Sequence, residues 1–365
     1  RQLLLDLGIS DDELSMMEDE EQSRADAARK QLDNIPWPDP ETVTLGVTSI
    51  HDAETHSKHI ERLKSGVTIS DSSLEVGELD IEFSTASDSW TYSRAIQQAM
   101  VTIADRYPNS IIFMGEDMEI AGAFGMNLAI KNAGHGDRLL DMPLSEACII
   151  HSATGAALAG MRPVAEIQFG GFAALGFNAL INNAAMLRWR WGAEVPLTVR
   201  IPLGGRTRSG PFHANMIESW FSNDPGLIIL APSTPQDAYD LLVEAAELPD
   251  PVLYLEHIGL YGLRGGVTGW GDNINQIVDN ASVQSAIESE QNYKIGKAAV
   301  IRGGRDVTVI TWGAMLHVAL KAADELAKQD IQLEVVDLRT LIPFDADTCV
   351  ASVARTGRLM VLQEG

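Results

Sequence analysis

Residues 111–117 read Ile111-Ile112-Phe113-Met114-Gly115-Glu116-Asp117, an apolar run that ends in a glycine and two acidic residues. Four consecutive apolar residues bounded by turn residues predict a short buried strand. The preceding segment predicts a helix, because its apolar residues have helical spacing: Tyr92, Ile96, Met100 and Ile103. Helices that alternate with buried strands are typical of a mainly parallel α/β sheet. Such sheets bind ligands at the carboxyl ends of their strands, so Glu116 is a candidate binding residue.

Outward from this strand, the alternation of strands and helices continues along the chain. Further strands are predicted at residues 164–169, 197–201, 227–230 and 252–255. A helix opens at Pro235, between the last two strands. A second α/β unit follows, with strand, helix, strand and strand at residues 307–310, 316–328, 333–336 and 359–362.

The fold class is therefore α/β, with two sheet-containing domains at residues 89–261 and 294–365. Residues 262–293 lie between them and are rich in Gly, Asn, Ser and Gln, which predicts a connector or insertion. We expect both ends of the sequence to be cut. An α/β domain normally continues past a strand such as the one at 359–362 with a covering helix, so the second domain is interpreted as incomplete.

Residues 1–88 differ from the rest of the chain. Ser10-Asp11-Asp12-Glu13 is a capping box, and the residues after it predict an acidic helix that ends before Pro36. Residues 41–89 are rich in Ser, Thr, Asp and Glu with few apolar residues, which predicts a linker. Its histidines fit no common metal-site spacing, so we interpret them as surface residues: His51, His56 and His59.

The formal net charge is −24, from 51 acidic and 27 basic residues. A surface of this sign repels nucleic acid and anionic lipid, so neither is an expected partner. Cys148 and Cys349 are too few for a disulfide framework, which is typical of a reducing compartment. The sequence has no secretory signal and no membrane-spanning run. We expect the bacterial cytoplasm or the mitochondrial matrix as its location.

Asp141-Met142-Pro143-Leu144-Ser145-Glu146-Ala147 leads into a predicted helix rich in small residues, which implies close packing. Glu146 is expected near the start of this helix and partly buried. Burial raises the pKa of a carboxyl group and a helix N-terminus lowers it. Opposed effects of this kind can poise a group for proton transfer. The alternative is a first-turn glutamate that merely accepts hydrogen bonds from backbone N–H groups.

Two groups of motifs occur along the chain in the order of one known family. The first group is Gly115-Glu116-Asp117, Pro143-Leu144-Ser145-Glu146-Ala147, Arg162-Pro163-Val164-Ala165-Glu166-Ile167-Gln168-Phe169, Pro225-Gly226-Leu227 and Pro232-Ser233-Thr234-Pro235. The second group is Gly296-Lys297-Ala298, Asp306-Val307-Thr308, Asp337-Leu338-Arg339-Thr340-Leu341-Ile342-Pro343 and Thr356-Gly357-Arg358-Leu359. Together they resemble the beta subunits of the decarboxylating component of 2-oxo acid dehydrogenase complexes. The resemblance implies a pyrimidine-binding domain for thiamine diphosphate, followed by a transketolase C-terminal-like domain.

The resemblance also implies roles for individual residues. Glu146 matches the glutamate that hydrogen-bonds the aminopyrimidine of thiamine diphosphate and promotes deprotonation of its thiazolium carbon. Phe172 matches the aromatic residue that packs on this ring, with an ordinary core phenylalanine as the alternative. Leu144 and Glu116 are further expected cofactor contacts. His213, on a glycine-rich loop, matches a histidine that donates a proton or orients the incoming lipoyl group, with a solvated loop residue as the alternative.

Three positions depart from the family's pattern. The family usually has an acidic residue where Gly171 stands, and an Asp-Gln-Ile run where this chain has Asn178-Ala179-Leu180. It usually continues with Ser-Gln where Ala214-Asn215 follows His213. The departures place the local packing, and contacts with a partner subunit, in question.

The segment that binds Mg²⁺ and diphosphate in thiamine enzymes, a Gly-Asp-Gly followed by paired asparagines, is missing from the sequence, and Gly271-Asp272-Asn273 is a poor substitute. We therefore expect an alpha partner to hold Mg²⁺ and to share the thiamine diphosphate, with no metal ligand in this chain. The resemblance implies an alpha-2-beta-2 assembly with beta-beta contacts, and a dihydrolipoyl acyltransferase core as a further partner.

Several alternatives stay open at this point. The acidic helix and the Pro-Asp-Pro element after it are similar to the tail of an alpha subunit, so the chain is either part of an alpha-beta fusion or carries a plain extension. A transketolase-type enzyme shares both domains, and a non-catalytic scaffold paralogue would explain the departures. Pyruvate, branched-chain 2-oxo acids and acetoin are all open as substrates, and we favour pyruvate or branched-chain 2-oxo acids as the commonest uses of this scaffold.

Overall fold

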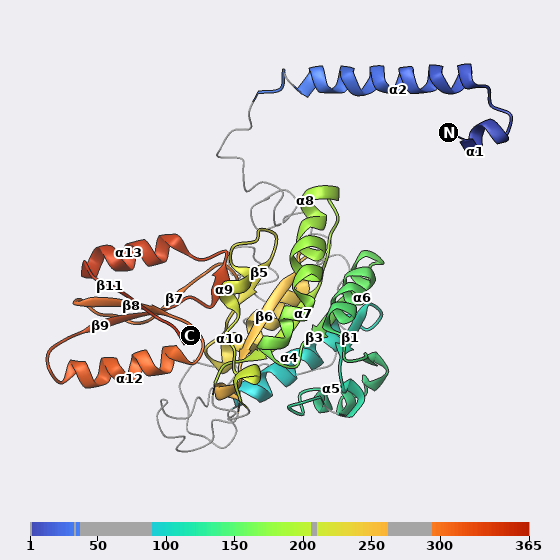
Figure 1. Ribbon diagram of the computed structural model, residues 1–365. Helices are drawn as coiled ribbons and strands as arrows, with labels where there is room; N and C mark the ends of the chain where they lie inside the picture. Colours follow the sequence, from blue (N-terminus) through green and yellow to red (C-terminus); the bar gives the residue numbers. More distant parts are fainter. Residues whose placement is uncertain are drawn as a thin grey trace. The chain divides into compact units, whose positions relative to one another are not determined.

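The computed structural model describes residues 2–32, 34–36, 90–120, 122–205, 210–261 and 294–364 (Figure 1). The chain divides into two compact units, residues 1–45 and residues 46–365. The predicted linker with its three histidines and the predicted connector at 262–293 lie outside the described residues. Among the described residues, no helix has the length and apolar character needed to cross a membrane.

The N-terminal unit contains helices α1 (Gln2–Asp6) and α2 (Asp11–Leu32). The predicted capping box is confirmed. The Ser10 backbone N–H donates to the Glu13 carboxylate at 3.0 Å, and the Glu13 N–H donates to the Ser10 hydroxyl at 3.3 Å. These reciprocal bonds satisfy donors that a helix start would otherwise leave without partners.

The second unit is built on a seven-stranded sheet with the order β10-β5-β6-β4-β3-β1-β2. Its strands are β1 (Ile111–Gly115), β2 (Leu139–Asp141), β3 (Arg162–Glu166), β4 (Thr198–Leu203), β5 (Ile228–Leu230), β6 (Val252–His257) and β10 (Thr340–Ile342). All neighbours pair in parallel except β10, which is antiparallel to β5. The mainly parallel sheet predicted from the sequence is confirmed.

Three of these strands differ from the prediction. The strand predicted to reach Phe169 ends at Glu166, because the chain turns there into a short helix at Gly170–Phe172. β2 and β10 were not predicted, since each has only two apolar residues, whereas the equally short β5 lies in a run of four.

Helices cover both faces of this sheet (Figure 1). α4 (Tyr92–Arg106) and α10 (Pro235–Glu247) pack on one face, with Ile228 and Leu230. α6 (Glu146–Leu158) and α7 (Ala173–Asn178) pack on the other, with Ile229. The alternation along β5 follows from the period of two in a strand and explains why its residues are all apolar.

Shorter helices complete this unit. They are α5 (Leu128–Asn132), α8 (Leu187–Trp191), α9 (Glu218–Phe221), the 3₁₀ turns η3 (Met118–Ile120), η4 (Gly136–Arg138), η5 (Gly170–Phe172), η7 (Ala184–Met186), η8 (Pro211–His213) and η9 (Ile258–Leu260), and the π turn η6 (Ala179–Asn183).

A four-stranded sheet with the order β11-β8-β9-β7 follows. Its strands are β7 (Ala299–Arg302), β8 (Val307–Thr311), β9 (Leu333–Asp337) and β11 (Leu359–Leu362). Helices α12 (Met315–Ala327) and α13 (Ala346–Thr356) cover its two faces. The elements predicted at 307–310, 316–328 and 333–336 are confirmed to within a residue at each end, whereas β7, antiparallel to β9, was not predicted.

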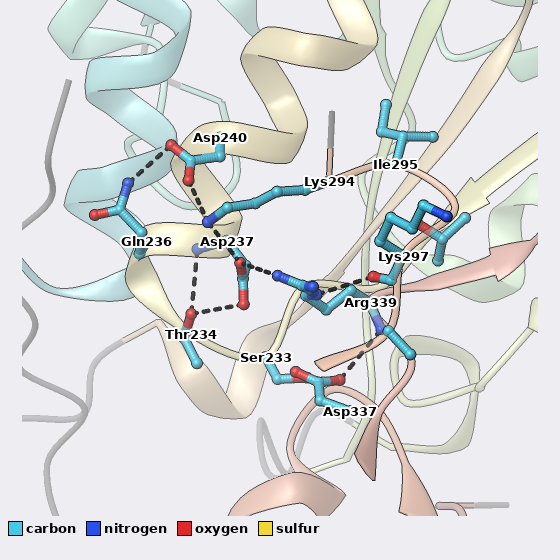
Figure 2. A network of polar contacts seen from close by, with 12 residues as sticks. Ser233, Thr234, Gln236, Asp237, Asp240, Lys294, Ile295, Lys297, Asp337 and Arg339 are labelled. Atoms are coloured by element: carbon cyan, nitrogen blue, oxygen red, sulfur yellow. Dashed lines mark hydrogen bonds and ion pairs between the residues drawn. The ribbon is translucent and has the colours of Figure 1, made fainter. Parts of the chain in front are cut away.

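A buried polar network, which we call the joint, connects the two sheets (Figure 2). The Asp237 carboxylate accepts hydrogen bonds from Lys294 Nζ at 3.0 Å and from Arg339 Nη1 at 3.3 Å. The Ser233 hydroxyl donates to Asp337 at 2.9 Å. Ser233 lies just before α10 and Asp237 lies in its first turn, whereas Asp337 ends β9. The contacts therefore fix the second sheet against the first.

Candidate active site

The strand order identifies the carboxyl ends of β1 and β3 as the edge of the sheet where a ligand is expected to bind, and we call this edge the crevice. β1 lies between β2 and β3, so the chain changes direction across the sheet at β1. Ligands bind outside the carboxyl ends of parallel strands at such a switch point. Glu116 follows β1 directly and Glu166 ends β3, so two carboxyl groups reach this edge.

Glu146 is the first residue of α6, as the sequence predicted, with Ser145 as the N-cap. It is 6% exposed. Gly176 of α7 packs on this turn, since a β-carbon there would lie 3.7 Å from the Glu146 carbonyl oxygen. Within the described residues, no backbone N–H donates a hydrogen bond to the Glu146 carboxylate, which argues against a purely helix-capping role.

Glu116 is 4% exposed, and its Oε1 atom is buried without a hydrogen-bond partner among the described residues. Burial, and then the nearby negative charges of Glu146, Asp117 and Glu166, raise the pKa of Glu116 to about 7. The carboxyl group can therefore carry a proton near neutral pH. An oxygen that lacks a partner at a ligand-binding edge is available to a polar group of a ligand.

A buried ion-pair triad includes Glu166, the residue that ends β3 at this edge. Arg200 Nη1 donates to Glu166 at 2.8 Å, and its Nη2 and Nε donate to Glu256 at 2.9 and 2.5 Å. The three residues belong to β3, β4 and β6 and are at most 3% exposed. The sequence reasoning missed this triad, although charged residues inside apolar strand runs were a usable signal.

Three rings gather beside the carboxyl end of β3. The His213 ring centroid lies 4.5 Å from that of Phe169 and 5.4 Å from that of Phe172, both edge-on. His213 Nδ1 is buried and has no hydrogen-bond partner in the described part of the chain. Phe172 directly precedes α7, which packs against the first turn of α6. The arrangement brings together the predicted Phe172 and His213, and adds Phe169, which the sequence did not single out as a site residue.

Leu144 lies in the turn between β2 and α6 and is 85% exposed. The described residues therefore do not bury it against the other predicted site residues. Asn178 is exposed at the end of α7, where its side-chain oxygen accepts a hydrogen bond from Asn182 at 2.8 Å.

The described residues contain no group of three or more His, Cys, Asp or Glu side chains that could hold a metal ion. Cys148 is exposed and Cys349 is buried, and both are free thiols.

Two family models match the chain. The transketolase pyrimidine-binding domain matches residues 88–262, and the transketolase C-terminal domain matches residues 296–365. A split-gene transketolase described as an inactive beta4 tetramer has a similar fold, with a TM-score of 0.57 at 21% identity over 75% of this chain and 78% of that chain.

Two curated relatives are much closer in sequence. The beta subunit of acetoin:2,6-dichlorophenolindophenol oxidoreductase from Cupriavidus necator is 40% identical over 74% of this chain and 78% of its own length. The pyruvate dehydrogenase E1 component subunit beta from Bacillus subtilis is 39% identical over 75% of this chain and 79% of its own length. The chain therefore belongs to the family of beta subunits of thiamine-dependent 2-oxo acid dehydrogenase E1 components.

Proposed function

We propose that this chain is the beta subunit of an enzyme that decarboxylates a 2-oxo acid and transfers the acyl group to a lipoyl acceptor. The observation that carries the proposal is the pair Glu116 and Glu146, two buried carboxyl groups at the switch-point edge of a pyrimidine-binding domain.

The residues present fit the aminopyrimidine half of thiamine diphosphate. Glu116 Oε1 and His213 Nδ1 are buried polar atoms without partners among the described residues. Phe172 offers an aromatic surface beside His213. When bound, the cofactor supplies a carbon nucleophile and an acceptor for the electrons released on loss of carbon dioxide.

We assign three roles to the residues of this chain. Glu146 exchanges a proton with the pyrimidine ring, and its position at the start of α6 places it near the positive end of the helix dipole. Glu116 and Leu144 bind the cofactor, and Phe172 packs on the ring. His213 holds or donates a proton on the substrate side, because its ring is fixed by Phe169 and Phe172.

An alpha partner completes the site in this proposal. It holds Mg²⁺ and the diphosphate, and two alpha and two beta chains assemble around a beta-beta contact. A dihydrolipoyl acyltransferase core binds this assembly, in the bacterial cytoplasm or the mitochondrial matrix. The exposed Leu144, in the turn before Glu146, is a side chain that a cofactor or partner would cover.

Pyruvate, branched-chain 2-oxo acids and acetoin are the substrate classes to test. The two relatives above are named for acetoin and for pyruvate, and their identities to this chain differ by one percentage point. Sequence identity therefore does not favour either compound.

The test is turnover by this chain assembled with an alpha partner, thiamine diphosphate and Mg²⁺ over that substrate panel. One compound is expected to be turned over, and Glu146→Gln to lower the rate about 10²- to 10⁴-fold, the usual range for loss of a general acid-base group. Absence of turnover by a well-assembled wild-type protein would instead support the scaffold interpretation, and turnover only of a sugar phosphate would support a transketolase-type enzyme.

A further inference from the structure

The pair Gly170-Gly171 lies in close contact with the segment that carries His213. A β-carbon at Gly171 would lie 2.7 Å from the Phe212 carbonyl oxygen. A β-carbon at Gly170 would lie 2.7 Å from the Asn215 carbonyl oxygen. A β-carbon at either position would therefore lie closer to a backbone atom of the 212–215 segment than β-carbons lie in real proteins.

The need for glycine at these positions comes from proximity and not from backbone conformation. Neither residue has a positive φ, so an alanine could adopt the same backbone dihedral angles. The atoms in the way belong to the backbone, and a backbone carbonyl cannot rotate aside as a flexible side chain can. In this chain, any larger residue at Gly171, including the acidic residue that the family usually has there, would require the 212–215 segment to lie farther away.

The residues on either side of the pair are the two phenylalanines that hold the His213 ring. Phe169 and Phe172 contact that ring edge-on, and the glycines between them admit the backbone on both sides of it. Phe169-Gly170-Gly171-Phe172 is thus one structural unit, which we call the histidine seat. The aromatic residues fix the ring, and the glycines fix how closely its backbone approaches.

We propose that Gly171 is a positioning residue for His213, because the absence of its side chain sets the depth at which the imidazole sits in the crevice. The effect on catalysis rests on the role proposed above for His213, whereas the effect on the segment does not. Misplacement of a catalytic group by about 1 Å can cost about a hundredfold in rate, so a single methyl group is a sufficient perturbation.

The test combines Gly171→Ala with His213→Gln in a double-mutant cycle, using the protein assembled with its alpha partner and cofactors. Gly171→Ala is expected to lower kcat/KM about 10- to 100-fold in the wild-type background, and less than about twofold in the His213→Gln background. An equal loss in both backgrounds would overturn the proposal, because Gly171 would then act on something other than His213.

Amide hydrogen exchange of residues 210–217 is the second readout, and it does not depend on activity. Exchange is expected to rise in Gly171→Ala and to stay unchanged in Gly303→Ala, a matched control in which the new β-carbon would meet no atom within 4 Å. Unchanged exchange in Gly171→Ala would refute the seat. If His213→Gln leaves turnover intact while exchange still rises, the catalytic role of His213 fails and the seat stands.

A variant that adds no atom guards against a folding failure of Gly171→Ala. Phe169→Leu removes the ring whose centroid lies 4.5 Å from that of His213. Exchange in 210–217 is expected to rise in this variant too, since the segment loses this contact with the seat. Exchange equal to that of the wild type would count against the proposal.

Discussion

The crevice and the joint both contain buried carboxyl groups, but the pKa values of Glu116 and Asp237 are shifted in opposite directions. In the joint, Asp237 faces the two cations Lys294 and Arg339 (Figure 2). Burial raises the pKa of Asp237, but Lys294 and then Arg339 outweigh burial, so its pKa lies below the usual value. In the crevice, Glu116 has the negative Glu146 as a neighbour, and its pKa is raised to about 7.

Burial alone therefore does not identify a functional carboxyl group. Asp337 in the joint also has a buried oxygen without a partner among the described residues, and burial and then Asp237 raise its pKa to about 7. What separates Glu116 is its place at the carboxyl ends of parallel strands, near Glu146. Binding of a ligand should therefore shift the pKa of Glu116 and leave the pKa of Asp337 unchanged.

The largest effect is expected from the buried triad around Arg200. Arg200→Met leaves Glu166 and Glu256 buried without their cation, which should cost about 3–5 kcal/mol of unfolding free energy. Urea denaturation measures this loss. The matched control is Arg302→Met, whose partner Asp324 is exposed, with an expected change of at most about 1 kcal/mol. Equal effects in the two variants would show that the triad does not support the crevice.

A smaller loss is expected from Asp237→Asn in the joint, about 2–3 kcal/mol at pH 7, because Arg339 loses its anion whereas Lys294 keeps Asp240. The folded pKa of Asp237 is lowered, so its contribution is complete above the unfolded pKa of about 3.9 and is lost as pH falls through the folded value. Urea midpoints of the two proteins should converge towards pH 2. A constant difference down to that pH would contradict the assignment.

Asp337→Asn should act in the opposite direction. The folded pKa of about 7 exceeds the unfolded value of about 3.9, so the folded state holds the proton more tightly and wild-type stability falls as pH rises from 4 to 7. The asparagine variant lacks this penalty and should be about 1–2 kcal/mol more stable at pH 8, below the upper limit of about 4 kcal/mol that a shift of about three pKa units sets at about 1.4 kcal/mol each. Melting temperatures at pH 5 and pH 8 test this, and a variant less stable than the wild type at pH 8 would refute it.

The smallest effect is expected for Glu116→Gln, and it separates the two regions directly. Loss of one hydrogen-bonding carboxyl group should weaken thiamine diphosphate binding about tenfold in the assembled protein. The rise in melting temperature on adding the cofactor should shrink in Glu116→Gln and stay unchanged in Asp337→Asn. An equal loss in both variants would remove the distinction between crevice and joint.

The sequence predicted those parts of the molecule whose information is local. α4, α10 and α12 carry a strong helical period, and Glu146 follows a turn motif that fixes the helix start. β2, β7 and β10 were missed although the predicted β5 and β11 are equally short, and two of the missed strands pair antiparallel within mainly parallel sheets. Their places depend on partners far away in the chain.

The candidate site divides in the same way. Glu116, Phe172 and His213 were predicted from motifs. The edge-on contact of Phe169 with His213 and the approach of Phe212 to Gly171 depend instead on the path of the chain between them. The triad around Arg200 joins residues 34 and 56 positions apart, a pairing that strand order decides and composition does not.

We propose that Glu146 activates the cofactor by proton transfer, and exchange of the thiazolium proton of bound thiamine diphosphate with solvent deuterium reports on that step. In the protein assembled with its alpha partner, Glu146→Gln is expected to slow this exchange at least about a hundredfold, whereas His213→Gln leaves it unchanged. Exchange at the wild-type rate in Glu146→Gln, with the cofactor still bound, would contradict the account.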